Sequence, residues 1–303
     1  MPSRQQPLCA PSRACLALGR EFDTQQVPSN SFDVPDGLPT FYRSLRDRAG
    51  YHVMVTGKDD LTKHSGYNQN GSYRAVELGF SAWQGRTPGK DGTMKAKAGP
   101  YPAFLDTQTV LLSNGSTVNA LMAHDECMPL SQFNPDKART WLACCDKSGG
   151  EGTCGTPTPL TDDLYEDTWV AMEGLKMLRQ RPAGKPWYMQ VNWPGPHGPF
   201  IVTKSMREAT ATREYPQPHD YTRGGLNESQ LLESRQLYSA EVENLDKWMG
   251  EYLKTIEELG DTNNTVSRRC LAVEAEHIHY LTARPRSDRV HLKRPRRTAG
   301  RPR

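Results

Sequence analysis

The 303-residue chain has no long hydrophobic run and few aliphatic residues. No stretch of about 18 apolar residues occurs, so we expect no segment that spans a membrane. Met1 to Pro7 contains no apolar core of the kind that signal peptides have. Leu, Ile, Val and Phe together account for 51 residues, or 17% of the chain. This share is below the roughly 20% that ordinary globular domains exceed, so we expect a thin core surrounded by long polar loops.

Acidic residues are scarce at the C-terminal end. Residues 267–303 contain eleven Arg or Lys and three acids, a net charge of +8, whereas the whole chain carries only +3. This composition predicts a folded region over residues 1–266 and a basic, disordered tail over residues 267–303. A basic tail also suits a polyanion, but almost no aromatic residues alternate with its arginines, which makes nucleic acid an unlikely partner.

Seven cysteines are present, and four of them cluster between residues 127 and 154. Cys127, Cys144, Cys145 and Cys154 are equally compatible with disulfides and with unpaired thiols, and the odd total leaves at least one thiol over. Four asparagines begin Asn-x-Ser/Thr sequons and predict glycosylation, which favours a secretory origin. They are Asn70, Asn114, Asn227 and Asn263.

Hydrophobic periodicity predicts an α/β fold. The expected helices cover residues 38–48, 162–180 and 228–259, the expected strands 51–56 and 186–193, and a hairpin 107–122. Gly50 and Gly260 end two of the helices. Functional loops in such folds follow the carboxyl ends of the strands.

One short stretch near the N-terminus combines a cysteine, a proline and an arginine: Cys9-Ala10-Pro11-Ser12-Arg13. Pro11 suits the first residue of a helix, which places Cys9 just ahead of the positive helix end. Arg13 can hold an oxygen anion there with its forked donors. Gly19 is the expected end of this helix.

This stretch resembles the nucleophile motif of type I sulfatases, the formylglycine-dependent branch of the alkaline-phosphatase superfamily. Three later stretches resemble family motifs in the same order: Gly50–Leu61, Lys185–Phe200 and Tyr238–Val266. The resemblance implies a sulfatase-like α/β domain with a mixed sheet flanked by helices. It also implies that residues 1–266 form a partial N-terminal sulfatase domain, without the family's first strand and C-terminal part.

The resemblance implies sulfuric ester hydrolysis, with a sulfate ester as substrate. Cys9 is the expected nucleophile, after a formylglycine-generating enzyme has oxidised it to an aldehyde that is held as its hydrate. Arg13 lies beside it, Lys58 and His197 bind the sulfate oxygens, and His197 also suits protonation of the leaving oxygen. Members of the family are secretory, lysosomal or extracellular.

Two departures from the family pattern affect these expectations. Asp60 stands where the family's Gly-Lys-x-His motif has histidine, and it repels an anionic substrate unless it is protonated or paired; His64 is a candidate replacement. The family binds calcium through formylglycine, here Cys9, and through carboxylates upstream of the nucleophile and after the Asn-Thr segment. We find neither carboxylate set, so we expect this polypeptide to be inactive as it stands. The alternatives are a phosphonate or phosphate ester hydrolase of the same superfamily and a non-catalytic polyanion-binding protein.

Overall fold

A computed structural model describes residues 8–62, 74–85, 100–112, 114–127, 157–197, 200–216, 227–272 and 276–283. The helices are α1 (Cys9–Leu18), α2 (Phe41–Ala49), α3 (Ala75–Leu78), α4 (Pro100–Asp106), α5 (Ala120–Cys127), α6 (Glu166–Arg179), α7 (Lys204–Thr210) and α8 (Glu228–Glu258). The strands are β1 (His52–Gly57), β2 (Ala82–Gly85), β3 (Thr109–Leu111), β4 (Thr117–Asn119), β5 (Trp187–Asn192), β6 (Thr265–Ala272) and β7 (Glu276–Ala283).

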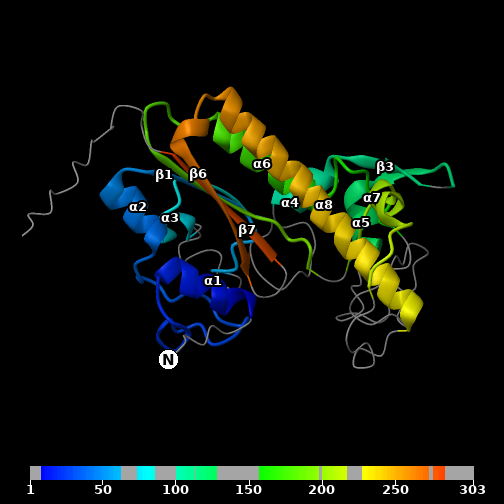
Figure 1. Ribbon diagram of the computed structural model, residues 1–303, viewed down its shortest axis with the longest axis horizontal. Coiled ribbons are helices and arrows are strands. Elements are labelled where there is room, and N and C mark those ends of the chain that lie inside the picture. The colour runs from blue at the N-terminus through cyan, green and yellow to red at the C-terminus, as the bar shows by residue number, and fades with distance from the viewer. Residues whose placement is uncertain are drawn as a thin grey trace, which may run out of the picture.

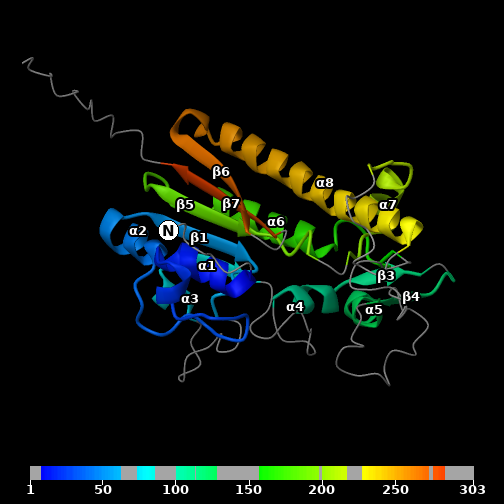
Figure 2. The ribbon, with the colours of Figure 1, turned by 60° about the horizontal axis from the view of Figure 1, so that its bottom comes forward.

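A five-stranded sheet in the order β2-β1-β5-β7-β6 forms the middle layer. Strands β2, β1 and β5 are parallel, whereas β7 runs antiparallel to both β5 and β6. Helices α1, α2 and α3 lie on one side of the sheet, and α6 and α8 lie on the other (Figures 1 and 2). The expected α/β fold with a mixed sheet flanked by helices is therefore confirmed.

Strand β5 is buried on both faces. Trp187 and Met189 belong to the core that the sheet shares with α6 and α8. Tyr188 points the other way, into the core beneath α1 and α2. Gln190 and Asn192 share the face of Tyr188, because side chains alternate along a strand, and both are fully buried. Polar residues therefore line one face of a central strand.

The long helix α8 begins where its sequence predicts. The Asn227 side chain accepts from the backbone N–H of Gln230, and the Gln230 side chain accepts in return, which forms a capping box. The Tyr252 hydroxyl donates to the carbonyl of Ala171 in α6 over 2.9 Å. A Cβ at Gly174 would lie 1.9 Å from that hydroxyl, so this glycine permits the close approach of α6 and α8. Helix α6 begins at Glu166, four residues later than expected.

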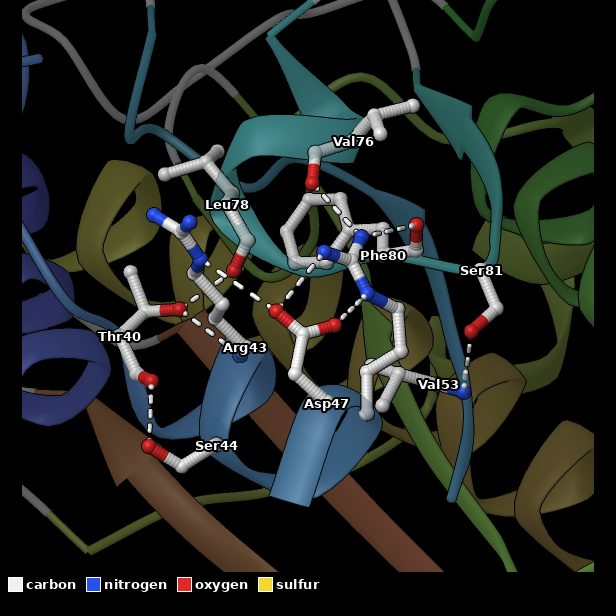
Figure 3. A network of polar contacts seen from close by, with 10 residues as sticks. Thr40, Arg43, Ser44, Asp47, Val53, Val76, Leu78, Phe80 and Ser81 are labelled. Atoms are coloured by element: carbon white, nitrogen blue, oxygen red, sulfur yellow. Dashed lines mark hydrogen bonds and ion pairs between the residues drawn. The ribbon is translucent and has the colours of Figure 1, made fainter. Parts of the chain in front are cut away.

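Residues around α3 pack over α2 (Figure 3). Thr40 caps α2 through its hydroxyl oxygen and donates the hydroxyl proton to the carbonyl of Leu78. Arg46 of α2 donates to the carbonyl of Val76 over 2.7 Å. Gly79 has a φ of 104°, and a Cβ there would lie 2.2 Å from a backbone nitrogen of α2. Helix α2 therefore starts at the residue after Thr40 rather than at residue 38.

The expected hairpin is present as β3 and β4, with Asn114 and Gly115 in its turn. Gly115 has a φ of 83°, the conformation that such a turn requires. The hairpin lies with α4, α5 and α7 beyond one end of the sheet (Figures 1 and 2).

The boundary predicted between residues 266 and 267 lies inside a strand. Strand β6 crosses it, and β7 pairs with β5 over Trp187↔Ala283 to Asn192↔Ile278. A disordered tail from residue 267 is thus not what the structure has as far as residue 283. The basic composition led to a wrong prediction of disorder for residues 267–272 and 276–283, because backbone hydrogen bonding to a neighbouring strand does not require an apolar sequence. Residues 284–303 lie outside the described residues, where the disordered tail remains a prediction.

Several other predictions fall outside the described residues: those for His64, Asn70, Cys144, Cys145 and Cys154. In the part of the chain that the structure describes, no helix is both long and apolar enough to cross a lipid bilayer.

Candidate functional site

Helix α1 carries Cys9 and Arg13 one turn apart. Residues four positions apart lie on the same face of a helix, and both side chains are buried, with 4% and 2% exposed. The helix begins at Cys9, two residues earlier than expected, so Pro11 occupies the first turn rather than the first position. A proline is tolerated there because the N–H groups of the first turn have no partner within the helix. Gly19 ends the helix with a φ of 62°, as expected.

Lys58 follows β1 at the carboxyl edge of the parallel strands. Gly57, the last residue of β1, has a φ of 82°, and a Cβ there would lie 1.9 Å from the carbonyl oxygen of Asn192. The Lys58 N–H donates to that same carbonyl over 2.9 Å. This hydrogen bond holds the start of the loop that follows β1 against the end of β5. Because a Cβ at position 57 would collide with the same carbonyl, only glycine fits there.

A row of buried polar side chains on β5 leads to Arg13. The hydroxyls of Tyr42 and Tyr188 donate to Gln190 Oε1 over 2.7 and 3.1 Å. Gln190 Nε2 then donates to Asn192 Oδ1 over 2.8 Å. Arg13 Nη1 donates to the same Asn192 oxygen over 2.9 Å. The row therefore fixes the guanidinium of Arg13 against the sheet.

Sequence reasoning missed Gln190 and Asn192. The signal is present in the sequence, because Trp187–Asn192 alternates apolar and more polar residues. A polar residue at every second position of a buried strand indicates a polar row on one face.

Asp60 joins the two cations of the site. Its Oδ2 lies 3.5 Å from Arg13 Nε and 3.7 Å from Lys58 Nζ. The side chains of Arg13, Lys58 and Asp60 are 2%, 16% and 4% exposed. Of the two possibilities that the sequence left open for Asp60, a protonated or a paired carboxyl group, the structure shows pairing, with Arg13 and Lys58.

His197 lies in the loop after β5, at the same edge of the sheet as Lys58. Its side chain is exposed, and its backbone N–H donates to the carbonyl of Pro194 over 3.3 Å. Parallel neighbouring strands end at one edge, which places this loop beside the Lys58 loop. The structure thus brings Arg13 and Lys58 together through Asp60, and the exposed His197 lies in the neighbouring loop.

A buried carboxyl pair lies beneath the His197 loop. The Gly195 N–H donates to Asp167 Oδ1 over 3.1 Å, and the Tyr165 hydroxyl donates to Glu241 Oε1 over 3.4 Å. A Cβ at Gly195 would meet Asp167 Oδ2 at 2.5 Å and Glu241 Oε2 at 3.3 Å. Burial, and secondarily the charge of Asp167, raises the pKa of Glu241 well above its ordinary value.

Sequence reasoning also missed this pair. Glu241 lies four residues from both Leu237 and Leu245, which are buried on α8. A carboxyl group on the apolar stripe of a helix was therefore a readable signal.

The donor set around Arg13 and Lys58 does not fit a calcium ion. Calcium takes six to eight oxygen ligands, whereas the carboxylate in contact with these two cations is Asp60, which both of them already pair with. Among the residues that the structure describes, no three His, Cys, Asp or Glu side chains come together as a metal site. We therefore derive no chemical step through calcium.

Three of the four predicted glycosylation asparagines are described, and all three are exposed. Asn114 and Asn227 use their side-chain oxygens as acceptors in a turn and a helix cap. Asn263 lies in the 3₁₀ turn Thr262–Asn264 that follows α8. Glycosylation at these positions stays a prediction.

The chain is similar to known proteins in sequence and in fold. An arylsulfatase of Clostridium perfringens (strain 13 / Type A) is 21% identical over 182 residues, which is 48% of this chain and 38% of the arylsulfatase. The phosphonate monoester hydrolase of Agrobacterium radiobacter has a similar fold, with a TM-score of 0.53 at 14% identity, over 91% of this chain and 58% of that one. BT4656, solved in complex with its substrate D-glucosamine-2-N,6-O-disulfate, gives a TM-score of 0.51 at 13% identity over 93% and 62%.

The chain thus spans less than two thirds of the length of each of these relatives. The Sulfatase family model matches residues 4–266, which include α1, the Lys58 loop, the His197 loop and α8. The chain belongs to the sulfatase family.

Proposed function

We propose that this chain carries the nucleophile and the anion-binding groups of a sulfuric ester hydrolase. The observation that supports this most is the meeting of Arg13, on the helix of Cys9, with Lys58 around a shared carboxylate. A buried and a half-buried cation near a helix N-terminus form a place where an ester anion is stabilised.

In the proposed reaction, Cys9 acts after oxidation to formylglycine. One hydroxyl of the aldehyde hydrate loses its proton as its oxygen attacks sulfur, and the S–O bond to the alcohol breaks as the alcohol oxygen takes up a proton, for which His197 is the proposed donor. The second hydroxyl then loses its proton, the aldehyde re-forms and sulfate leaves. Arg13 and Lys58 hold the anion throughout.

The first test is modification of Cys9. Co-expression with a formylglycine-generating enzyme should convert Cys9 and leave Cys15 as a thiol. Trypsin cleaves after Arg13, so the two cysteines fall in different peptides, and Cys15, which is buried in the same helix, serves as an internal control. An unmodified Cys9 in mass spectra would contradict the proposal.

The second test is binding of the ester anion. Lys58→Gln should weaken binding of an aryl sulfate about tenfold, because one of the two cations is lost. Lys254→Gln, at an exposed position of α8, removes the same charge and should leave binding unchanged. Equal effects of the two variants would mean that the loss of binding comes from the net charge of the protein and not from the position of Lys58.

Phosphonate monoesters are the second candidate substrate class. The fold similarity to the phosphonate monoester hydrolase of Agrobacterium radiobacter supports this candidate. A phosphonate monoester also presents a singly charged anion to Arg13 and Lys58. Parallel titration with an aryl sulfate and an aryl phosphonate ranks the two classes. If neither binds better than chloride, the remaining candidate is a non-catalytic polyanion-binding protein.

A further inference from the structure

The position of Asp60 has a consequence beyond structural pairing. Its carboxylate contacts both cations that the proposed function assigns to the substrate anion, at 3.5 Å from Arg13 Nε and 3.7 Å from Lys58 Nζ. With its side chain only 4% exposed, it lies with the two cations in a poorly solvated environment.

The backbone prevents Asp60 from moving aside easily. Its φ of 55° lies in the left-handed region, which Asp, Asn and His tolerate better than other non-glycine residues. On one side of it, Asp59 accepts from the N–H of Leu61 over 2.8 Å and from the indole N–H of Trp83 over 3.3 Å. On the other side, Leu61 is 1% exposed within the core beneath α1 and α2. Asp60 is thus held by anchored neighbours.

The charge balance of the three groups shows what Asp60 does to an incoming anion. Two cations and one carboxylate carry a net charge of +1, and without the carboxylate they would carry +2. Where side chains are shielded from water, each unit of charge has a large effect on binding. A bound anion must therefore share Arg13 and Lys58 with a carboxylate that repels it.

We propose that Asp60 is an internal counter-ion that competes with the substrate anion and biases the site against doubly charged anions. Asp60 is thereby a specificity-determining residue. The inference rests on the proposed function in one respect, namely that Arg13 and Lys58 bind the ester anion.

The test compares two probes that differ in charge, inorganic sulfate and methyl sulfate. Asp60→Asn keeps the size and the backbone preference of the residue and removes its charge. Isothermal titration of the 303-residue chain should show a gain of about tenfold in affinity for methyl sulfate, which carries one negative charge. The gain for sulfate, with two charges, should be about a hundredfold, since the removed repulsion scales with the charge of the anion. Asp23→Asn, at an exposed position, gives the same net charge and should change neither affinity.

Equal gains for the two probes, or no gain, would overturn the proposal, because a steric or structural role does not depend on the charge of the anion. Asp60→Asn also removes a carboxylate partner of both cations, which destabilises the fold. Its unfolding temperature should therefore fall in chloride and recover in sulfate, whereas the wild-type chain should respond little to the exchange. Asp60→Gly, which also accepts a positive φ, repeats the test if the asparagine variant does not fold. If neither variant folds even in sulfate, the proposal is wrong, since a bound anion should replace the missing carboxylate.

Failure of the proposed function leaves a different pattern. A chain that lacks esterase chemistry still shows the charge-dependent gain in Asp60→Asn, because the titration measures anion binding alone. If Asp60 has no such role, Cys9 is still modified and Lys58→Gln still weakens aryl sulfate binding, but Asp60→Asn gives no charge-dependent gain in anion affinity.

Discussion

Asn192 is the residue that connects strand β5 to the cation of α1. Its Oδ1 accepts from both Arg13 Nη1 and Gln190 Nε2, and its Nδ2 donates to the carbonyl of Thr56 over 3.2 Å. Asn192→Ala leaves buried donors without an acceptor, which costs about 1–3 kcal/mol for each unsatisfied group. We expect a lower free energy of unfolding in urea and weaker sulfate binding. Asn263→Ala, at an exposed position, is the control and should change neither.

Glu241 makes the stability of the fold depend on pH. Burial, and secondarily the charge of Asp167, raises the pKa of Glu241 above 4.5. The Tyr165 hydroxyl also faces this carboxyl group and donates to it. Between 4.5 and the higher folded-state pKa, the folded protein binds a proton that the unfolded chain has released, so stability falls as pH rises through this window. Glu241→Gln should flatten this fall.

Urea midpoints measured from pH 4 to pH 8 check the Glu241 prediction. Glu258→Gln, at an exposed position near the end of α8, should keep the wild-type slope. An unchanged slope in Glu241→Gln would mean that another group titrates in this range.

At the scale of the element, α8 depends on its N-terminal capping box. Asn227→Ala removes the acceptor for the Gln230 N–H and should lower the free energy of unfolding by about 1 kcal/mol. Lys254→Ala, at a solvent-exposed position away from the N-terminus of the same helix, should have little effect, because alanine favours helix. Circular dichroism during urea titration compares the two variants, and equal losses would show that the cap contributes nothing of its own.

The elements that the sequence predicted best are those with a local pattern. Helices α6 and α8 repeat apolar residues at helical spacing, and Gly50 and Gly115 mark a helix end and a turn by their positive φ. Strands β6 and β7 escaped prediction because they follow a change of composition and their pairing is set by β5 from far away in the chain. The cations Arg13 and Lys58 were predicted from motif resemblance. The position of Asp60 between these cations and the polar row through Gln190 could not be predicted, because both depend on the register of the strands.

At the scale of the whole molecule, the pairing of β7 with β5 changes what truncation should do. Deleting residues 267–303 removes β7 and most of β6, and β5 becomes an edge strand. We expect a large drop in the thermal unfolding midpoint. Deleting residues 284–303 leaves the whole described sheet in place and should leave the midpoint nearly unchanged. Equal midpoints for the two deletions would show that β6 and β7 add nothing to the stability of the sheet.

Turnover by the 303-residue chain is also a property of the whole molecule. Its described residues do not supply a calcium site at Arg13 and Lys58, so we expect no stoichiometric calcium binding and no aryl sulfate hydrolysis above background, even with Cys9 converted. Adding, from a full-length relative, the two segments that supply the family's calcium-binding carboxylates, one upstream of the nucleophile and one after the Asn-Thr segment, should recover both properties, and Cys9→Ala should abolish the hydrolysis. Calcium-dependent hydrolysis by the chain alone would contradict this expectation.

The hydrogen bond from Arg13 to Asn192 joins residues 179 positions apart, and this separation governs when the site can assemble. A contact of such range forms only after the entropy of closing the intervening chain has been lost, which makes folding of such topologies slow. During refolding, sulfate binding should therefore appear together with the last phase of β-sheet formation and not before it. A nascent chain arrested ahead of Trp187 would already hold Cys9, Arg13 and Lys58, yet it would have no strand to align them.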